Sequence, residues 1–272
     1  MMAAAKRTVL VLHGYSQNAS VFSRRLGALR KEAKDVDMVF IDAPHILQPA
    51  DLFNSSQQSQ SEAQSGLLSE VQQNQATIAA TDPSLSPRAW WKANADRTKA
   101  VGMEESIAVV RDVLKGRRFD GVLGFSQGAA FAAIIAALLE RPHLYPDFLI
   151  DGQPPHPPLQ FCIAVSGFRV NDPICDPIFT PSYSTPTLHI IGKTDIVVVE
   201  ERSKQLVDMS SNKRVEEHEG GHFVPSKGNW RKFLAEYMRD PFATLVSPGS
   251  SAPPSGTATP TGGNESALMM KL

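Results

Sequence analysis

Cysteine is scarce in this chain of 272 residues, which contains only Cys162 and Cys175. Two cysteines can form one bridge at most, so the protein is not a small scaffold held together by disulfides. Cys162 lies in the apolar run at 161–165, and we interpret both cysteines as structural, with Cys162 a buried thiol.

An excess of charge of one sign is also missing, because 27 basic and 28 acidic residues leave a formal net charge of −1. Such a balance offers no electrostatic attraction for nucleic acid or an anionic membrane. Long apolar runs are missing too, since the longest, at 129–139, is shorter than the roughly 20 residues of a membrane span. We therefore expect no nucleic-acid partner and no membrane span.

The first residues lack the features of a secretory signal. After Lys6 and Arg7 the apolar run covers only 8–12. A signal peptide needs about 7–15 apolar residues followed by a cleavage site of small residues. We therefore expect a location in the cytoplasm, or in the cytoplasm and nucleus.

Short β-branched runs alternate with segments of helical period along most of the chain. The chain is long enough for one large domain. This alternation predicts an α/β fold with a mostly parallel central sheet and helices on both faces. We assign it to a single domain at 1–240. Strands are predicted at 8–12, 37–41, 121–124, 160–165, 187–191 and 214–218, and helices at 21–34, 99–115, 128–139, 200–208 and 227–239.

Two segments depart from the alternation of strands and helices. Residues 54–76 are rich in Gln and Ser, a composition that buries little, and are predicted to be a mobile insertion in a small lid-like excursion. Residues 247–263 consist almost entirely of Pro, Ser, Gly and Thr. We therefore expect the end of the chain, at 241–272, to be a disordered tail.

The pentapeptide at 124–128 (GFSQG) matches the pattern Gly-x-Ser-x-Gly. It follows an apolar strand and opens a helix of small residues, which is the strand–turn–helix setting of a nucleophile elbow. In such an elbow the serine backbone is strained, and side chains in place of the glycines would collide with the neighbouring helix and strand. The pattern therefore predicts Ser126 as a nucleophile.

A serine hydroxyl needs a base to take its proton, and folds with this elbow carry serine, acid and histidine in that order. Asp195 directly follows the strand at 187–191, and His222 follows the strand at 214–218 behind two glycines. We predict His222 as the base and Asp195 as the acid that orients it. Other histidines and aspartates are weaker alternatives by their positions: His143, His156, His189, His218, Asp172 and Asp176.

Two further pairs of residues stand near this predicted centre. The loop that follows the first strand, with His13 and Gly14, predicts an oxyanion hole made by the backbone N–H groups of Tyr15 and Gln127. His13 itself is expected to hold that loop in place. Trp90 and Trp91 belong to the excursion, where two alternatives stay open: they line a pocket for an apolar acyl group, or they anchor the excursion in the core.

Several motifs together resemble the FSH-type family of eukaryotic serine hydrolases, which includes the fungal FSH hydrolases and the ovarian-cancer-associated hydrolase of animals. In chain order they are 9–14 (VLVLHG), 41–45 (IDAPH), 89–91 (AWW), 121–128 (GVLGFSQG), 192–195 (GKTD) and 221–225 (GHFVP). The resemblance spans roughly residues 6–240. It implies a small α/β-hydrolase with a Ser-Asp-His triad that acts on esters or thioesters, and the triad carries over to Ser126, Asp195 and His222. The Gln- and Ser-rich insertion and the tail depart from the family pattern.

The sequence leaves three candidate functions open. The first is cleavage of a carboxylic ester or thioester through an acyl-enzyme on Ser126. Its thioesterase form would release an acyl or polyketide chain from a carrier, as fungal relatives of this type do. The second is another α/β-hydrolase reaction of the dienelactone type, which a cysteine nucleophile would favour. The third is a non-catalytic binding module on a hydrolase scaffold. The expected partner is a small-molecule ester or thioester, with no metal and no organic cofactor, and the oligomeric state is not indicated.

Overall fold

The computed structural model describes residues 6–51 and 85–249. Its centre is a sheet of six strands in the order β10-β9-β8-β7-β1-β2, and each strand is parallel to its neighbours. The strands are β1 (Thr8–Leu12), β2 (Asp37–Ile41), β7 (Gly121–Phe125), β8 (Phe161–Val165), β9 (Thr187–Gly192) and β10 (Lys213–His218). Each predicted strand agrees with one of these to within one residue at either end, so the predicted parallel sheet is confirmed.

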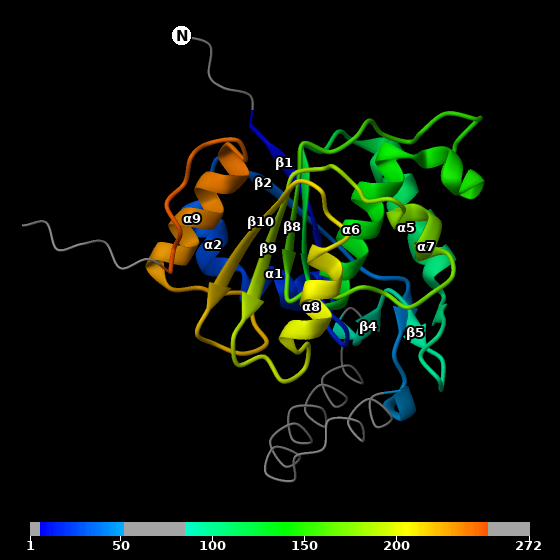
Figure 1. Cartoon of the computed structure of the whole chain (residues 1–272), viewed down its shortest axis with the longest axis horizontal. Helices are drawn as coiled ribbons and strands as arrows, with labels where there is room; N and C mark the ends of the chain where they lie inside the picture. The colour runs from blue at the N-terminus through cyan, green and yellow to red at the C-terminus, as the bar shows by residue number, and fades with distance from the viewer. Residues whose placement is uncertain (1–5, 52–84, 250–272) are drawn as a thin grey trace, which may run out of the picture.

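Helices cover both faces of the sheet (Figure 1). One face carries α1 (Ala19–Arg25), α2 (Gly27–Glu32) and α9 (Gly228–Arg239). The other carries α5 (Met103–Gly116), α6 (Gln127–Glu140), α7 (Cys175–Phe179) and α8 (Glu200–Val207). Two 3-10 turns, η2 (Pro142–Leu144) and η3 (Pro146–Phe148), follow α6. Within the described ranges, no helix is both long and apolar enough to cross a membrane.

Strand β1 shows why the strands are apolar throughout. Its side chains alternate, so that Val9 and Val11 pack with α1, α2 and α9, whereas Leu10 and Leu12 pack with the helices on the opposite face. Both faces of a sheet covered in this way must be hydrophobic. Helix α6 is likewise buried over residues 127–139, and its alanines let it lie close to the strands.

Two predicted helices differ from the observed ones. The helix predicted at 21–34 begins earlier, because the Asn18 side chain caps it by accepting a hydrogen bond from the Val21 N–H at 2.8 Å, and it divides at Leu26 into α1 and α2. The helix predicted at 99–115 begins later, because residues 100–101 pair as a strand and Gly102, with φ of +90°, turns the chain into α5.

Short antiparallel pairs form the described part of the excursion between β2 and α5. Strand β3 (His45–Ile46) pairs with β4 (Arg88–Ala89), and β5 (Lys92–Ala93) pairs with β6 (Ala100–Val101). The predicted insertion at 54–76 lies outside the described residues.

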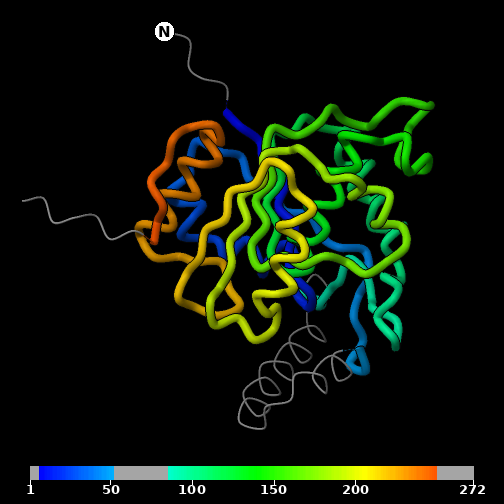
Figure 2. The backbone as a smooth tube through the Cα atoms, in the orientation of Figure 1, coloured from blue at the N-terminus to red at the C-terminus, as the bar shows by residue number. Residues whose placement is uncertain are grey.

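The chain after α9 remains in contact with the domain beyond the predicted boundary at 240. The Leu245 carbonyl oxygen accepts a hydrogen bond from the Arg214 side chain at 2.8 Å, and the Pro248 carbonyl oxygen accepts one from the Asn229 side chain. Figure 2 shows this segment, in orange, beside α9. The described part of the domain therefore reaches residue 249, and the rest of the predicted tail, 250–272, lies outside the described residues.

The strand order places a topological switch point between β1 and β7, at the carboxyl edge of the sheet. From β1 the chain first forms the neighbouring strand β2 and later crosses to β7 on the other side of β1. Connections that leave two adjacent parallel strands in opposite directions leave a space above their carboxyl ends. The loop after β1 and the turn after β7 therefore meet at this point.

Candidate active site

Ser126 occupies the sharp turn between β7 and α6, with φ of 54° and ψ of −118°. A positive φ is strained for a residue with a side chain, so the neighbouring structure must impose it. An added Cβ on Gly124 would lie 2.1 Å from the Gly128 carbonyl oxygen, and one on Gly128 would lie 2.3 Å from the Leu12 carbonyl oxygen. Backbone therefore approaches backbone on both sides of Ser126, which explains both glycines of the motif.

The structure brings together the three side chains predicted as nucleophile, base and acid. The Ser126 Oγ lies 2.9 Å from the His222 Nε2, and the His222 Nδ1 lies 2.7 Å from the Asp195 Oδ2. A carboxylate only accepts hydrogen bonds, so the Nδ1 carries the proton in this pair. The Nε2 of the neutral ring is then free to accept the hydrogen bond from the Ser126 hydroxyl.

Asp195 is held in place by backbone as well as by His222. Its Oδ1 accepts hydrogen bonds from the N–H groups of Val197 at 2.9 Å and Val198 at 2.8 Å. Burial raises the pKa of the Asp195 carboxyl, but the hydrogen bond and charge of His222 and the Val198 N–H outweigh it, and the pKa lies below its usual value. The carboxylate is therefore ionised and oriented at neutral pH.

The loops that carry Asp195 and His222 are joined by their backbones. The Thr194 N–H donates to the Gly220 carbonyl at 3.2 Å, and a Cβ on Gly192 would lie 2.5 Å from the Gly221 carbonyl oxygen. The His222 ring also packs on Phe125, with 4.8 Å between ring centroids. The glycines therefore allow the close approach that places the imidazole above Ser126.

The alternatives for base and acid lie in other contacts. Asp172 accepts a hydrogen bond from the Ala100 N–H at 2.7 Å, and Asp176 forms an ion pair with Arg169. In the part of the chain that the structure describes, none of the six alternatives bonds to Ser126 or His222.

The loop after β1 lies against the serine turn, as the oxyanion-hole prediction requires. A Cβ on Gly14 would lie 3.0 Å from the Phe125 ring and 3.4 Å from the Phe125 carbonyl oxygen. Over residues 6–51 and 85–249, no hydrogen bond uses the N–H of Tyr15 or of Gln127 as donor. Both donors therefore remain available to an oxygen of a bound substrate.

His13 holds this loop from within the core. It is fully buried, its Nε2 accepts a hydrogen bond from the Ala43 N–H at 3.0 Å, and its Nδ1 lies 2.8 Å from the Gly14 carbonyl oxygen. Burial lowers its pKa to about 4, so the ring is neutral at pH 7. These contacts agree with the holding role expected from its position.

Trp90 and Trp91 lie in the core, with side chains 0% and 4% exposed. The Trp90 indole N–H donates to the His13 carbonyl at 2.8 Å, and the Trp91 ring packs against Phe131 and Phe168. Such burial favours the anchoring alternative over a pocket wall.

The Gln127 side chain makes contacts that the sequence did not predict, since only its backbone N–H was assigned a role. The Gln127 side chain accepts a hydrogen bond from the Trp90 N–H at 2.9 Å and donates one to the Trp91 carbonyl at 2.8 Å. The signal was a long polar side chain at the start of a helix of small apolar residues.

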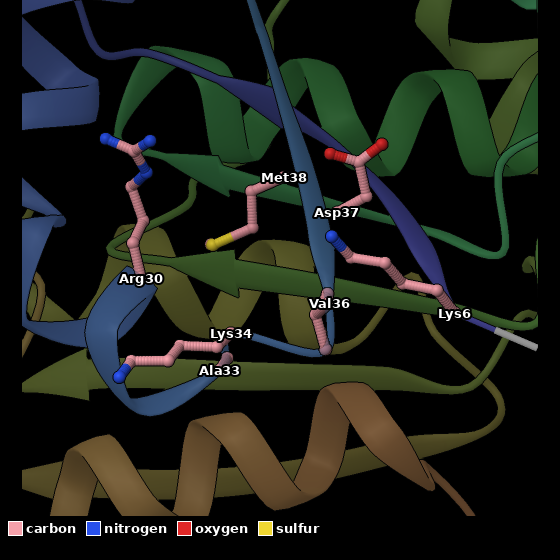
Figure 3. Close-up of a pocket in the computed structure, with 7 residues that line it drawn as sticks. All are labelled: Lys6, Arg30, Ala33, Lys34, Val36, Asp37 and Met38. Atoms are coloured by element: carbon pink, nitrogen blue, oxygen red, sulfur yellow. The ribbon is translucent and has the colours of Figure 1, made fainter. Parts of the chain in front are cut away.

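A surface pocket of about 210 Å³ lies away from these residues (Figure 3). Asp37, one of its lining residues, is the first residue of β2, whereas Ser126 follows the last residue of β7. In a parallel sheet these positions are at opposite edges. The pocket is therefore separate from the candidate active site, and it is lined by Lys6, Arg30, Ala33, Lys34, Val36, Asp37 and Met38.

Solved structures support the fold. Acyl-protein thioesterase 2 of Zea mays has a TM-score of 0.56 at 20% identity, over 88% of this chain and 94% of that one. Esterase PE8 has a TM-score of 0.52 at 20% identity, over 87% and 93%. The predicted α/β-hydrolase fold is confirmed.

Sequence comparisons identify the family. A family model described as serine hydrolase (FSH1) matches residues 2–234. Esterase OVCA2 of Danio rerio is 34% identical over 250 residues, which cover 88% of this chain and 99% of that protein. Esterase AAEL000016 of Aedes aegypti is 30% identical over 245 residues, with 87% and 76% covered. The resemblance seen in the motifs is thus confirmed, and the chain belongs to the FSH1 family of serine hydrolases.

Proposed function

We propose that this hydrolase cleaves carboxylic esters or thioesters through an acyl-enzyme on Ser126, with Asp195 and His222 completing a catalytic triad. The observation that carries the proposal is the bonded series Ser126 Oγ, His222 and Asp195, at 2.9 and 2.7 Å. Relatives named as esterases, at 34% and 30% identity, support the same reaction class.

The proposed reaction has two steps. His222 takes the proton of Ser126 while the Oγ attacks the substrate carbonyl, and Asp195 stabilises the imidazolium that forms. The N–H groups of Tyr15 and Gln127 stabilise the oxyanion of the tetrahedral intermediate. His222 then gives the proton to the leaving alcohol or thiol, and a water molecule deprotonated by the same ring hydrolyses the acyl-enzyme.

Exposed apolar side chains beside the triad favour a substrate with an apolar acyl group. Ile196 and Val197 follow Asp195 and are 61% and 53% exposed, and Phe223 follows His222 and is 48% exposed. We call these three residues the apolar rim. Exposed apolar side chains gathered at one place often mark a binding surface.

Labelling with a fluorophosphonate probe tests the nucleophile directly. The probe is expected to modify Ser126, as identified by peptide mass, and Ser126→Ala is expected to abolish labelling and ester hydrolysis without unfolding the protein. Ser226→Ala changes an exposed serine four residues after His222 and serves as the matched control. Turnover retained in Ser126→Ala, or an unlabelled wild-type protein, would exclude the proposed mechanism.

A comparison of substrates, rather than of protein variants, distinguishes a thioesterase from a carboxylesterase. Oxygen esters and thioesters of one acyl chain, offered at graded chain lengths, share the acyl-enzyme and differ only in the leaving group. A kcat/KM that is higher for the thioesters over the whole series would assign the protein to the thioesterases, and the opposite order would assign it to the carboxylesterases.

A further inference from the structure

Two arginines near the candidate active site have guanidinium groups that pair with no carboxylate of residues 6–51 or 85–249. Arg202 lies on α8, and Arg97 lies in the turn between β5 and β6. Across the residues that the structure describes, neither guanidinium takes part in a hydrogen bond or an ion pair. Arg97 is exposed and Arg202 is half-buried. Burial of a guanidinium costs less when an anion pairs with it, so Arg202 is a candidate to bind one.

The loop between β8 and α7 connects these two arginines. The Ser203 hydroxyl on α8 donates to the Gly167 carbonyl at 2.9 Å, and the Asn171 side chain donates to the Arg97 carbonyl at 3.2 Å. The loop follows the carboxyl end of β8, which neighbours β7, the strand that directly precedes Ser126. In Figure 1 it runs from the sheet past α8 toward β5. Both arginines therefore border the carboxyl edge of the sheet.

Phe168 in this loop holds the Arg202 side chain in place. The guanidinium carbon lies 4.5 Å from the centre of the Phe168 ring, which in turn packs edge-on against Trp91 at 6.3 Å. A cation over an aromatic face is stabilised by the ring, yet all of its N–H donors can still reach another group. The contact therefore orients Arg202 without using its hydrogen-bonding capacity.

Charges of both signs act on the Arg202 guanidinium. Burial lowers the pKa of Arg202, the positive charge of Arg97 lowers it further, and Asp195 acts in the opposite direction. The Asp195 carboxylate already bonds to His222, Val197 and Val198 and makes no hydrogen bond to either arginine. An anion bound between the two arginines would therefore offset the repulsion that Arg97 exerts on Arg202.

We propose that Arg97 and Arg202 form an anion subsite that binds a carboxylate or phosphate group of the substrate, beside the carbonyl attacked by Ser126. This inference rests on the proposed function. The planar, always charged guanidinium matches both anions with paired hydrogen bonds. The substrates of this site are then esters or thioesters that carry an anionic group, either on the acyl chain or on the leaving group.

Matched substrate pairs test the subsite and locate the anion. For the acyl side, the mono-p-nitrophenyl ester of adipic acid is compared with neutral p-nitrophenyl hexanoate. For the leaving group, hexanoyl-coenzyme A is compared with the neutral hexanoyl thioester of N-acetylcysteamine. The ratio of kcat/KM for the anionic to the neutral member is expected to fall about tenfold in Arg202→Met and in Arg97→Met, mainly through KM, in the pair that places its anion at the subsite.

Controls separate lost charge from lost packing. Arg202→Met keeps an apolar chain over Phe168, and Arg202→Lys, which retains the charge, is expected to recover part of the ratio. Lys204→Met removes a cation two residues away on α8, one that pairs with Glu200, and is expected to leave the ratio at its wild-type value.

A direct binding measurement does not depend on turnover. The Kd values of adipate and of coenzyme A, measured by calorimetry, are expected to rise about tenfold in Arg202→Met for the anion that uses the subsite. Ratios and Kd values unchanged by both arginine substitutions would overturn the subsite, even where neutral esters are hydrolysed normally. Failure of wild-type protein to hydrolyse any of the four substrates would instead count against the proposed function.

Discussion

The side chain of Gln127 is bonded to the backbone of Trp90, whose N–H donates to the Gln127 Oε1 at 2.9 Å. The same amide donates to the next carbonyl, that of Trp91, at 2.8 Å. The residue that follows Ser126 thus ties the excursion to the start of α6. Its backbone N–H is, at the same time, one of the two donors proposed for the oxyanion.

Replacement of Gln127 should therefore affect stability as well as activity. Gln127→Ala leaves a buried N–H and a buried C=O without partners, which should lower the free energy of unfolding by about 1–3 kcal/mol. Its kcat should also fall, because the backbone of the turn loses a tether. Urea denaturation and ester turnover measure the two effects. Gln153→Ala, at an exposed position, should change neither the unfolding free energy nor kcat. Equal changes in the two variants would contradict a stabilising role of the Gln127 side-chain hydrogen bonds.

Two glycine-to-alanine substitutions should have opposite effects. An added Cβ on Gly128 meets the Leu12 carbonyl oxygen at 2.3 Å, so Gly128→Ala should destabilise the protein by about 1–3 kcal/mol or more. Gly116 ends α5 with no atom within 4 Å of the added Cβ, so Gly116→Ala should stabilise it by about 0.4–1 kcal/mol. Thermal unfolding of both variants checks the signs, and a stable Gly128→Ala would contradict the close approach.

Asp195→Asn should reduce kcat by about 10³–10⁴, in line with serine hydrolase triads in general. The side-chain amide of this variant can donate a hydrogen bond to the His222 Nδ1. The ring proton then sits on the Nε2, and a protonated Nε2 cannot take the proton of the Ser126 hydroxyl. Steady-state turnover of a neutral ester measures the loss. A variant that keeps more than about a tenth of wild-type kcat would exclude Asp195 as the orienting acid.

The difference in stability between the wild type and Asp195→Asn should depend on pH. The pKa of Asp195 is lowered in the folded protein, so its carboxylate contributes stability above the unfolded pKa of about 3.9. This contribution is lost as pH falls through the folded pKa. The difference in unfolding free energy between wild type and Asp195→Asn should therefore narrow below about pH 4, and a constant difference would contradict it.

His189 should lower the free energy of unfolding in mild acid. It is buried in β9, its Nε2 has no hydrogen-bond partner among the residues that the structure describes, and burial lowers its pKa to about 4. Between the unfolded pKa of about 6.5 and this value only the unfolded chain takes up the proton, so stability falls as pH falls. His189→Leu should recover about 2–3 kcal/mol of the stability lost between pH 7 and 4.5. Denaturation at both pH values tests this, and the exposed His143→Gln should give no such recovery.

The two alternatives for the tryptophan pair can be separated by Trp91→Ala. Because Trp91 is buried against Phe131 and Phe168, the substitution should lower the free energy of unfolding by about 3–5 kcal/mol. Acyl chain-length preference should instead respond to Phe223→Ala, in the apolar rim, at little cost in stability. A change of chain-length preference in Trp91→Ala without loss of stability would restore the pocket alternative.

The parallel sheet and the three residues proposed as a triad were predictable because their signals are local. Buried parallel strands need continuous apolar runs, which made 8–12 and 161–165 visible, and the serine turn needs its two flanking glycines. Helix ends were less predictable, since Leu26 divides a helix of unbroken period and the pairing of Ala100 delays another. The second depends on the pairing of Ala100 with Ala93, which a helical period alone does not predict.

What the sequence determined by itself was the family and the parallel sheet, and it singled out Ser126, Asp195 and His222 as the residues proposed for the triad, because each is marked by residue type, order and flanking glycines. Tertiary structure alone decided what the other side chains do. It buried Trp90 and Trp91, gave the Gln127 amide its backbone partners, and placed the guanidinium of Arg202 over the Phe168 ring. The physical reason is that burial and pairing depend on which segments meet in space, and no local pattern records that meeting.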